Sequence, residues 1–164
     1  MSADKQSILI ASNNAHKLQE FREIFSQFGA TDIDLITPQT IGLALDPEET
    51  AQTYLDNARI KARAFHNLVR DESAAGLPTR PTNLWVMADD SGLEVDALGG
   101  SPGVRSARYH SASPNKDGCT TLLAEMAGVP ETQRTARFRC VIVLIAPDGR
   151  EYEFEGICEG AIGF

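Results

Sequence analysis

Apolar and polar stretches alternate along the chain in a way that predicts strands and helices in turn. Uninterrupted apolar runs at Ile8-Leu9-Ile10-Ala11 and Leu84-Trp85-Val86-Met87-Ala88 are typical of strands buried on both faces of a parallel or mixed sheet. A Val- and Ile-rich run at 138–146 leads through Pro147-Asp148-Gly149 to an alternating segment at 151–159, which predicts a hairpin. A further strand is predicted within residues 31–46. The pattern predicts an α/β fold.

Three segments place apolar residues at helical spacing between these strands. The first is followed by Gly29 as a stop, the second opens at Pro47-Glu48-Glu49-Thr50, and the third is capped by Asn115 or Asp117. The apolar stripes are Leu18, Phe21, Phe25 and Phe28; Tyr54, Ala58, Ala62, Phe65 and Val69; and Cys119, Leu122, Leu123 and Met126.

Composition and charge narrow the class of protein. The chain has 164 residues, of which 42% are hydrophobic and 23% charged, so we expect one globular domain. A formal net charge of -8 disfavours binding to nucleic acid or to an anionic membrane, and no run approaches the roughly 18 apolar residues of a membrane span. Three cysteines without close pairing favour a reducing compartment, so we expect a cytoplasmic protein. An anionic substrate would have to be captured locally.

A polar loop between the first strand and the first helix has the features of an anion site. Ser12, Asn13 or Asn14 can cap the helix, and Lys17 adds a positive charge beside its N-terminus. Free backbone N–H groups at such a helix start bind phosphate well. A plain capped strand-to-helix turn is the alternative interpretation.

Acidic residues follow the central apolar run. Asp89-Asp90-Ser91-Gly92 comes directly after Ala88, where ligands bind in open α/β sheets. Because successive strand residues point to opposite faces, at most one of Asp89 and Asp90 can face a given site. A simple bend made of turn-forming residues is the alternative.

The second predicted helix offers further polar side chains. Asn57 and Lys61 lie one helical turn apart, so both can reach a common ligand. Glu48 and Glu49, taken alone, are acids that complement the start of a helix. Arg105 and Arg108 are interpreted as surface residues.

Taken together, five segments resemble the inosine/xanthosine triphosphate pyrophosphatase family, in the family's order and over nearly the whole chain. They are Ser12-Asn13-Asn14-x-His16-Lys17, Glu48-Glu49-Thr50 with Asn57-Ala58-x-x-Lys61-Ala62, Ala88-Asp89-Asp90-Ser91-Gly92-Leu93, Leu98-Gly99-Gly100-x-Pro102-Gly103-Val104-x-Ser106-Ala107-Arg108, and Ala136-Arg137-Phe138-x-Cys140. The resemblance implies hydrolysis of non-standard purine nucleoside triphosphates, such as ITP, dITP and XTP, to the monophosphate and pyrophosphate. It also implies a Mg²⁺ requirement, a homodimer, and an elongated mixed sheet flanked by helices, with a cleft between two lobes.

The resemblance also assigns roles to individual residues. Ser12, Asn13, Asn14, Ala15, His16 and Lys17 would bind the triphosphate, with help from Lys61, and Ser91 would contact substrate. Glu48 and Asp90 would hold magnesium, and Asp90 would accept a proton from the attacking water. Carboxylate and phosphate oxygens are the ligands that magnesium prefers.

The end of the chain departs from the family pattern. Family members continue with a Phe-Gly-Tyr-Asp-Pro-like segment and a Ser-His-Arg segment associated with base recognition, and neither is present after Gly160-Ala161-Ile162-Gly163-Phe164. We therefore expect residues 1–164 to form a single pyrophosphatase domain that lacks the C-terminal part of the family fold. The alternatives are a non-catalytic nucleotide-binding fragment and a related pyrophosphatase of the septum-formation-inhibitor type.

Overall fold

The predicted apolar runs form one five-stranded mixed sheet. The computed structural model describes residues 6–12, 14–70, 83–112 and 117–163. The strand order is β2-β1-β3-β4-β5, in which β1 pairs in parallel with β2 and β3, while β3, β4 and β5 are antiparallel. The strands are β1 (Gln6–Ile10), β2 (Ile33–Ile36), β3 (Leu84–Val95), β4 (Thr135–Ile145) and β5 (Glu151–Ala161). The predicted hairpin at 138–159 is confirmed as β4 and β5.

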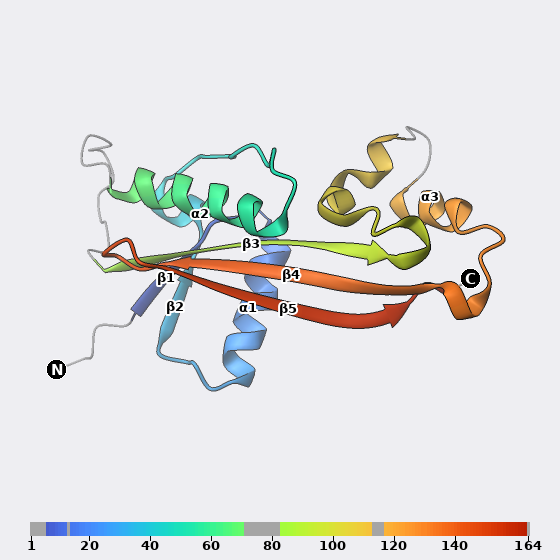
Figure 1. Cartoon of the computed structure of the whole chain (residues 1–164). Coiled ribbons are helices and arrows are strands. Elements are labelled where there is room, and N and C mark those ends of the chain that lie inside the picture. Colours follow the sequence, from blue (N-terminus) through green and yellow to red (C-terminus); the bar gives the residue numbers. More distant parts are fainter. Residues whose placement is uncertain (1–5, 13, 71–82, 113–116, 164) are drawn as a thin grey trace.

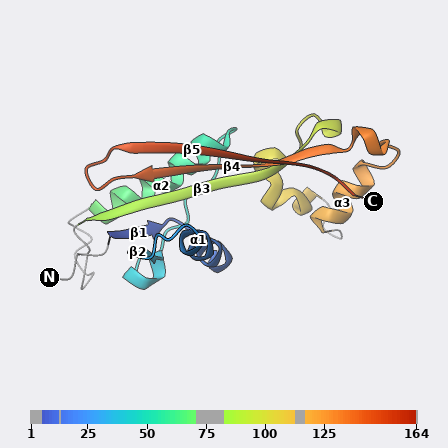
Figure 2. The same ribbon diagram turned by 90° about the horizontal axis from the view of Figure 1, so that it is seen from below.

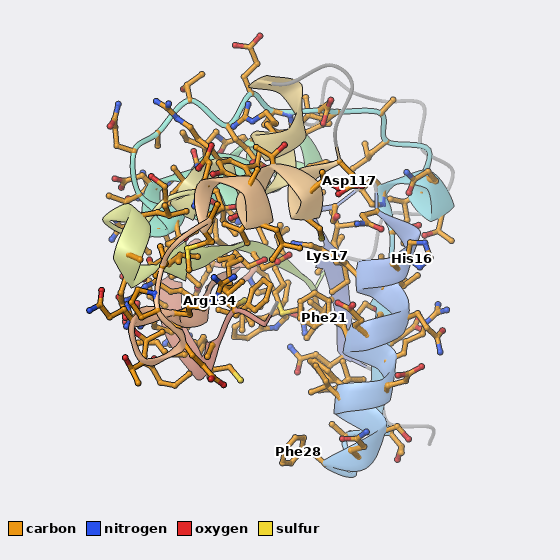
Figure 3. All side chains as sticks on the ribbon, turned by 90° about the vertical axis from the view of Figure 1, so that its right-hand side faces the viewer. His16, Lys17, Phe21, Phe28, Asp117 and Arg134 are labelled. Carbon is orange, nitrogen blue, oxygen red and sulfur yellow. The ribbon has the colours of Figure 1, made fainter. Side chains whose placement is uncertain are left out.

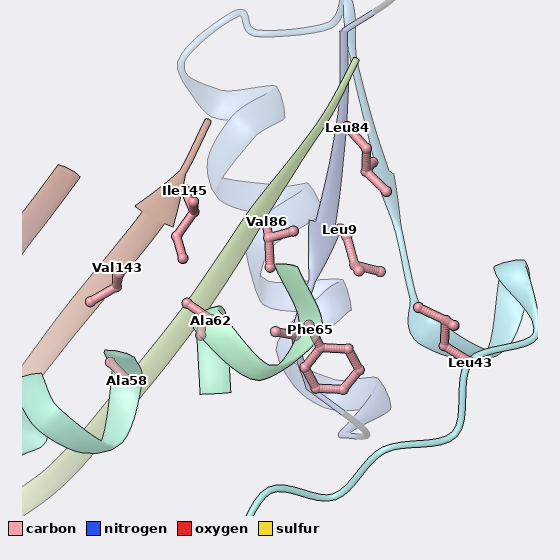
Figure 4. Packing of buried hydrophobic residues seen from close by; sticks show 11 residues of the cluster. Leu9, Leu43, Ala58, Ala62, Phe65, Leu84, Val86, Val143 and Ile145 are labelled. Atoms are coloured by element: carbon pink, nitrogen blue, oxygen red, sulfur yellow. The ribbon is translucent and has the colours of Figure 1, made fainter. Parts of the chain in front are cut away.

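Two helices cover opposite faces of this sheet (Figures 1 and 2). On one face, α2 (Tyr54–Arg70) packs its apolar stripe onto β1, β3 and β4 (Figure 4). On the other face, α1 (Ala15–Gln27) packs Leu18, Phe21 and Phe25 against β1, β2 and β3. Both faces of β1 and of the first half of β3 are therefore buried, as their uninterrupted apolar runs require.

The three long strands continue beyond these helices and give the molecule its elongated shape (Figure 1). The far half of β3 and β4 packs with α3 (Gly118–Glu125), and a 3₁₀ helix, η3 (Gly103–Ala112), lies beside β3. A separate apolar cluster at this end contains Val95, Leu122, Met126 and Ala136. The shorter 3₁₀ helices are η1 (Pro38–Ile41), η2 (Asp96–Leu98) and η4 (Glu131–Gln133). In the part of the chain that is described, no helix is both long and apolar enough to cross a membrane.

Helix boundaries follow the capping residues. Asp117 caps α3, as the sequence predicts, because its side chain accepts a hydrogen bond from the backbone N of Thr120. The expected start of the second helix at 47–50 is wrong, since α2 begins at Tyr54 after Thr53, whose hydroxyl accepts from the backbone N of Asp56. Phe28 is also misplaced in the predicted stripe: it ends α1 as the C-cap and is 83% exposed.

The central strand is longer than its apolar run. β3 continues to Val95, so the Asp89-Asp90-Ser91-Gly92 segment is neither a strand end nor a bend. The reason is pairing with β4, which matches Asp89 with Ile142 and Asp90 with Val141 and gives the backbone of both acids ladder partners. On the other side, the ladder with β1 ends at the pair Ile10 and Met87. The two acids therefore lie just past the carboxyl end of β1, where the sheet opens.

Candidate active site

The loop after β1 presents the start of α1 to this opening. Asn14 is the N-cap, and its Oδ1 accepts from the backbone N of His16 over 2.9 Å. Ser12 Oγ in turn accepts from the backbone N of Asn14 over 3.1 Å. These bonds hold the helix start in place, with the positive end of its dipole at the edge of the sheet. Asn13 lies outside the described residues.

Asp89 and Asp90 point to opposite faces of β3, as predicted from the pleat. Asp89 is 5% exposed and forms an ion pair with Lys17 of α1. Asp90 is 6% exposed and faces α2, where Asn57 Nδ2 donates to its Oδ2 over 3.1 Å. The two neighbouring acids therefore have different partners from different helices.

Lys61 connects Asp90 to the segment before α2. Its Nζ lies 2.8 Å from Glu49 Oε1 and 3.9 Å from Asp90 Oδ1. Asn57, which is fully buried, accepts from the backbone N of Ala51 over 2.9 Å. Asn57 and Lys61, which the sequence predicts to reach a common ligand, both approach Asp90.

The environment of Asp90 is unusual for a carboxylate. Burial raises the pKa of its carboxyl above the ordinary 3.8, and the negative charge of Glu49 adds to this. The hydrogen bond from Asn57 and the charge of Lys61 act in the opposite direction without cancelling the effect. Raised carboxyl pKa values in clefts are typical of groups that exchange protons.

Exposure alternates along the segment that leads into α2, and this decides which glutamate faces Asp90. Glu48 is exposed, whereas Glu49 is partly buried and bound to Lys61. In an extended backbone only one of two consecutive side chains can face inward. Of the two glutamates, Glu49 is therefore the one whose side chain faces Lys61 and Asp90 in the structure.

A cavity of about 330 Å³ collects these side chains. Its lining includes Ser12, Asn14, Lys17, Asp46, Glu49, Lys61, Phe65, Asp90, Ser91 and Ala107. Of the remaining predicted residues, Ala15 begins α1, and His16 is exposed. Figure 3 shows His16 on the side of α1 opposite to Lys17 and Phe21. The structure thus brings together residues from five separate segments of the sequence.

Two contacts near the cavity have no clear signal in the sequence. Arg108 of η3 donates to the backbone O of Glu49 over 3.0 Å, which links η3 to the segment before α2. Ser106 Oγ accepts from the backbone N of Leu93 over 2.9 Å and holds η3 against β3. Arg108, interpreted from sequence as a surface residue, therefore also fixes the backbone beside the site.

The donor set at this point fits a hard divalent cation. Within the described segments, no three or more His, Cys, Asp or Glu side chains gather in a possible metal cluster. Glu49 and Asp90 do converge on one cation, the ammonium of Lys61. Magnesium is commonly held by one or two carboxylates together with water and substrate phosphates, so this pair of acids fits such an ion.

Comparisons with known proteins agree with this architecture. A sequence model of the Ham1 family matches residues 8–164. A dITP/XTP pyrophosphatase of Corynebacterium efficiens is 41% identical over 156 residues, covering 94% of this chain and 69% of that protein. A dITP/XTP pyrophosphatase of Nitratidesulfovibrio vulgaris is 39% identical over 165 residues, covering 96% of this chain and 72% of that protein.

Solved structures share the fold. The Staphylococcus aureus Ham1 protein aligns with a TM-score of 0.72 and 35% identity, covering 96% of this chain and 72% of that chain. A HAM1 protein from Coxiella burnetii aligns with a TM-score of 0.71 and 30% identity, covering 96% of this chain and 73% of that chain. By its sequence over nearly its whole length and by its fold, this chain belongs to the Ham1 family.

Proposed function

We propose that this protein hydrolyses non-standard purine nucleoside triphosphates, such as ITP, dITP and XTP, to the nucleoside monophosphate and pyrophosphate. The observation that carries the proposal is that one cavity contains the start of α1, Lys61 and the buried Asp90. A phosphate-binding helix start and a proton-accepting carboxylate are the two parts that such a reaction needs. The relatives named dITP/XTP pyrophosphatase support the same reaction.

The phosphate groups would be held by the loop after β1. Ser12, Asn14 and the backbone of α1's first turn offer hydrogen bonds, and Lys17 and Lys61 offer positive charge. Asn13, Ala15 and His16 belong to the same proposed loop, His16 through its backbone. Ser91 lines the cavity beside Asp90 and would contact the substrate there.

Asp90 would accept the proton from the attacking water. The water oxygen forms a bond to the α phosphorus, the bond to the bridging oxygen breaks, and pyrophosphate leaves. Asn57 fixes the orientation of the carboxylate, and the raised pKa makes Asp90 a stronger base than an ordinary aspartate.

Glu49 and Asp90 would hold Mg²⁺, with Glu48 as the alternative that the family resemblance gives. When bound, magnesium supplies positive charge that offsets the phosphate charge and makes water easier to deprotonate. Lys61 would then release the two carboxylates and turn to the phosphate groups.

The proposal is tested by incubating the protein with ITP and Mg²⁺ and following the products by phosphorus NMR. Binding of ITP to the protein is measured in parallel by titration calorimetry. We expect pyrophosphate as the first product. Orthophosphate as the first product, in a preparation free of other pyrophosphatases, would contradict the reaction. Binding of ITP without any product would instead support a nucleotide-binding domain without catalysis.

The working assembly is a further part of the proposal. The family resemblance supports a single domain over residues 1–164, a homodimer and a cytoplasmic location, and the net charge of -8 argues against nucleic-acid and membrane partners. Light scattering at micromolar concentration tests the dimer, since it should give twice the chain mass of 17.8 kDa.

A further inference from the structure

Asp89 is a buried acid that the proposed reaction does not use. It lies in the middle of β3, is 5% exposed, and points away from Asp90 and α2. Its carboxylate forms an ion pair with the ammonium of Lys17. A charge this well buried needs a fixed partner, because losing that partner leaves it uncompensated.

The Lys17 side chain lies between the buried Asp89 and the cavity. Lys17 is the third residue of α1, its side chain is 27% exposed, and it lines the cavity with Ser12 and Asn14. An ammonium has three N–H donors, so its bond to Asp89 leaves others for a ligand. The contact is therefore compatible with simultaneous binding of a phosphate oxygen.

Without a partner, a lysine side chain samples many rotamers, and a ligand that fixes it must offset that lost entropy. Asp89 removes much of this cost, because β3 is held by its ladder with β4 and the carboxylate is buried. The ammonium is then already at the cavity when the ligand arrives.

We propose that Asp89 is a positioning residue that holds the Lys17 ammonium at the phosphate cavity. The inference rests on the proposed function, in which Lys17 binds the phosphate groups. It separates the two neighbouring acids by role: Asp90 acts on the attacking water, and Asp89 acts only through Lys17.

The sign of the effect distinguishes positioning from competition. If Asp89 merely competed with phosphate for the ammonium, its removal would tighten phosphate binding. If it positions Lys17, its removal weakens binding, and only while Lys17 is present.

A double-mutant cycle on the full chain tests this. Inorganic tripolyphosphate is the probe, since it has no base, and its affinity is measured by titration calorimetry for wild type, Asp89→Asn, Lys17→Met and the double variant. We expect Asp89→Asn to weaken binding about tenfold in the wild-type background and to have no further effect in the Lys17→Met background. Asp89→Glu, which keeps the charge, should recover part of the affinity.

Three results would overturn the proposal: equal losses in both backgrounds, tighter binding by Asp89→Asn, or no binding of tripolyphosphate by the wild type. If Asp89→Asn fails to fold, the same cycle with Asp89→Glu decides, since the displaced carboxylate should weaken binding only when Lys17 is present. Release of pyrophosphate from ITP is measured separately. A protein that shows the predicted cycle but releases no pyrophosphate contradicts the proposed function and not the role of Asp89.

Discussion

Asn57 and Asp90 are joined by a buried hydrogen bond, in which Asn57 Nδ2 donates to Asp90 Oδ2 over 3.1 Å. The other end of the same amide accepts from the backbone N of Ala51. The orientation of Asp90 is therefore set by α2 and the segment before it. These hydrogen bonds hold the carboxylate in one orientation, but its burial opposes folding.

The first prediction concerns the free-energy cost of burying the Asp90 carboxylate. A carboxyl whose pKa is higher in the folded state binds its proton more readily there, so its contribution to stability falls as pH rises from 3.8 to the raised value. At pH 7 the free energy of unfolding is lowered by the full cost of burying the charged carboxylate. Asp90→Asn removes it, so we expect the variant to be more stable than wild type at pH 7 by on the order of 1 kcal/mol in EDTA.

Urea unfolding at several pH values checks this. The advantage of Asp90→Asn should shrink as pH falls towards 3.8 and be lost below it, where the wild-type carboxyl is neutral in both states. Asp148→Asn is the matched control, because hydrogen bonding by Arg150 lowers the pKa of Asp148, so this variant should gain nothing. A less stable Asp90→Asn variant at pH 7 would contradict the burial argument.

The parts of this site that could be predicted from sequence are those whose signals lie within a few neighbouring residues. A cap among Ser12, Asn13 and Asn14, the opposite directions of Asp89 and Asp90, and the shared direction of Asn57 and Lys61 all follow from local signals. These predictions are confirmed by the contacts. The apolar stripes of α1 and α2 are confirmed for the same reason, apart from Phe28.

The missed features depend on contacts between distant segments. β3 continues through its acids because β4, about 50 residues later, pairs with them. The inward direction of Glu49 is set by Lys61 and by the bond from Arg108 to its backbone. No local pattern contains these partners.

A second prediction concerns the ammonium between the two carboxylates. Lys61 lies 2.8 Å from Glu49 and 3.9 Å from Asp90, at the position proposed for magnesium, so it competes with the metal. We expect Lys61→Met to bind Mg²⁺ about three- to tenfold more tightly than wild type in the absence of nucleotide, by calorimetry.

Lys17→Met is the matched control for this measurement. It removes the same charge from the lining of the same cavity, but its ammonium is bound to Asp89. An equal increase in Mg²⁺ affinity in both variants would show only a general effect of removing a positive charge. Weaker Mg²⁺ binding by Lys61→Met would place the metal elsewhere.

A third prediction separates the two glutamates before α2. Glu49 lines the cavity and Glu48 is exposed, so Glu49→Gln should raise the Mg²⁺ concentration needed for half-maximal turnover by about tenfold or more. Glu48→Gln, its neighbour with the same charge change, should have little effect. A larger effect of Glu48→Gln than of Glu49→Gln would instead identify Glu48 as the metal ligand.

A fourth prediction concerns the close approach of η3 to β3. A Cβ at Gly92 would overlap the backbone O of Gly103 and lie 2.7 Å from Ser106 Oγ and 2.8 Å from Tyr54 Oη. Gly92→Ala should therefore lower the free energy of unfolding by about 2 kcal/mol. Gly156 of β5 has nothing within 4 Å of its own Cβ position, so Gly156→Ala should leave stability nearly unchanged. Similar values for the two variants would contradict the packing at Gly92.

Asp90 is the proposed proton acceptor in magnesium-dependent release of pyrophosphate. The most direct measurement is the turnover number for ITP in saturating Mg²⁺, compared between wild type and Asp90→Asn with both proteins shown to be folded. The Asn side chain keeps the shape and cannot accept the proton at neutral pH, so we predict a fall of about 10² to 10⁴-fold or more. An Asp90→Asn variant with turnover close to that of wild type would contradict the account.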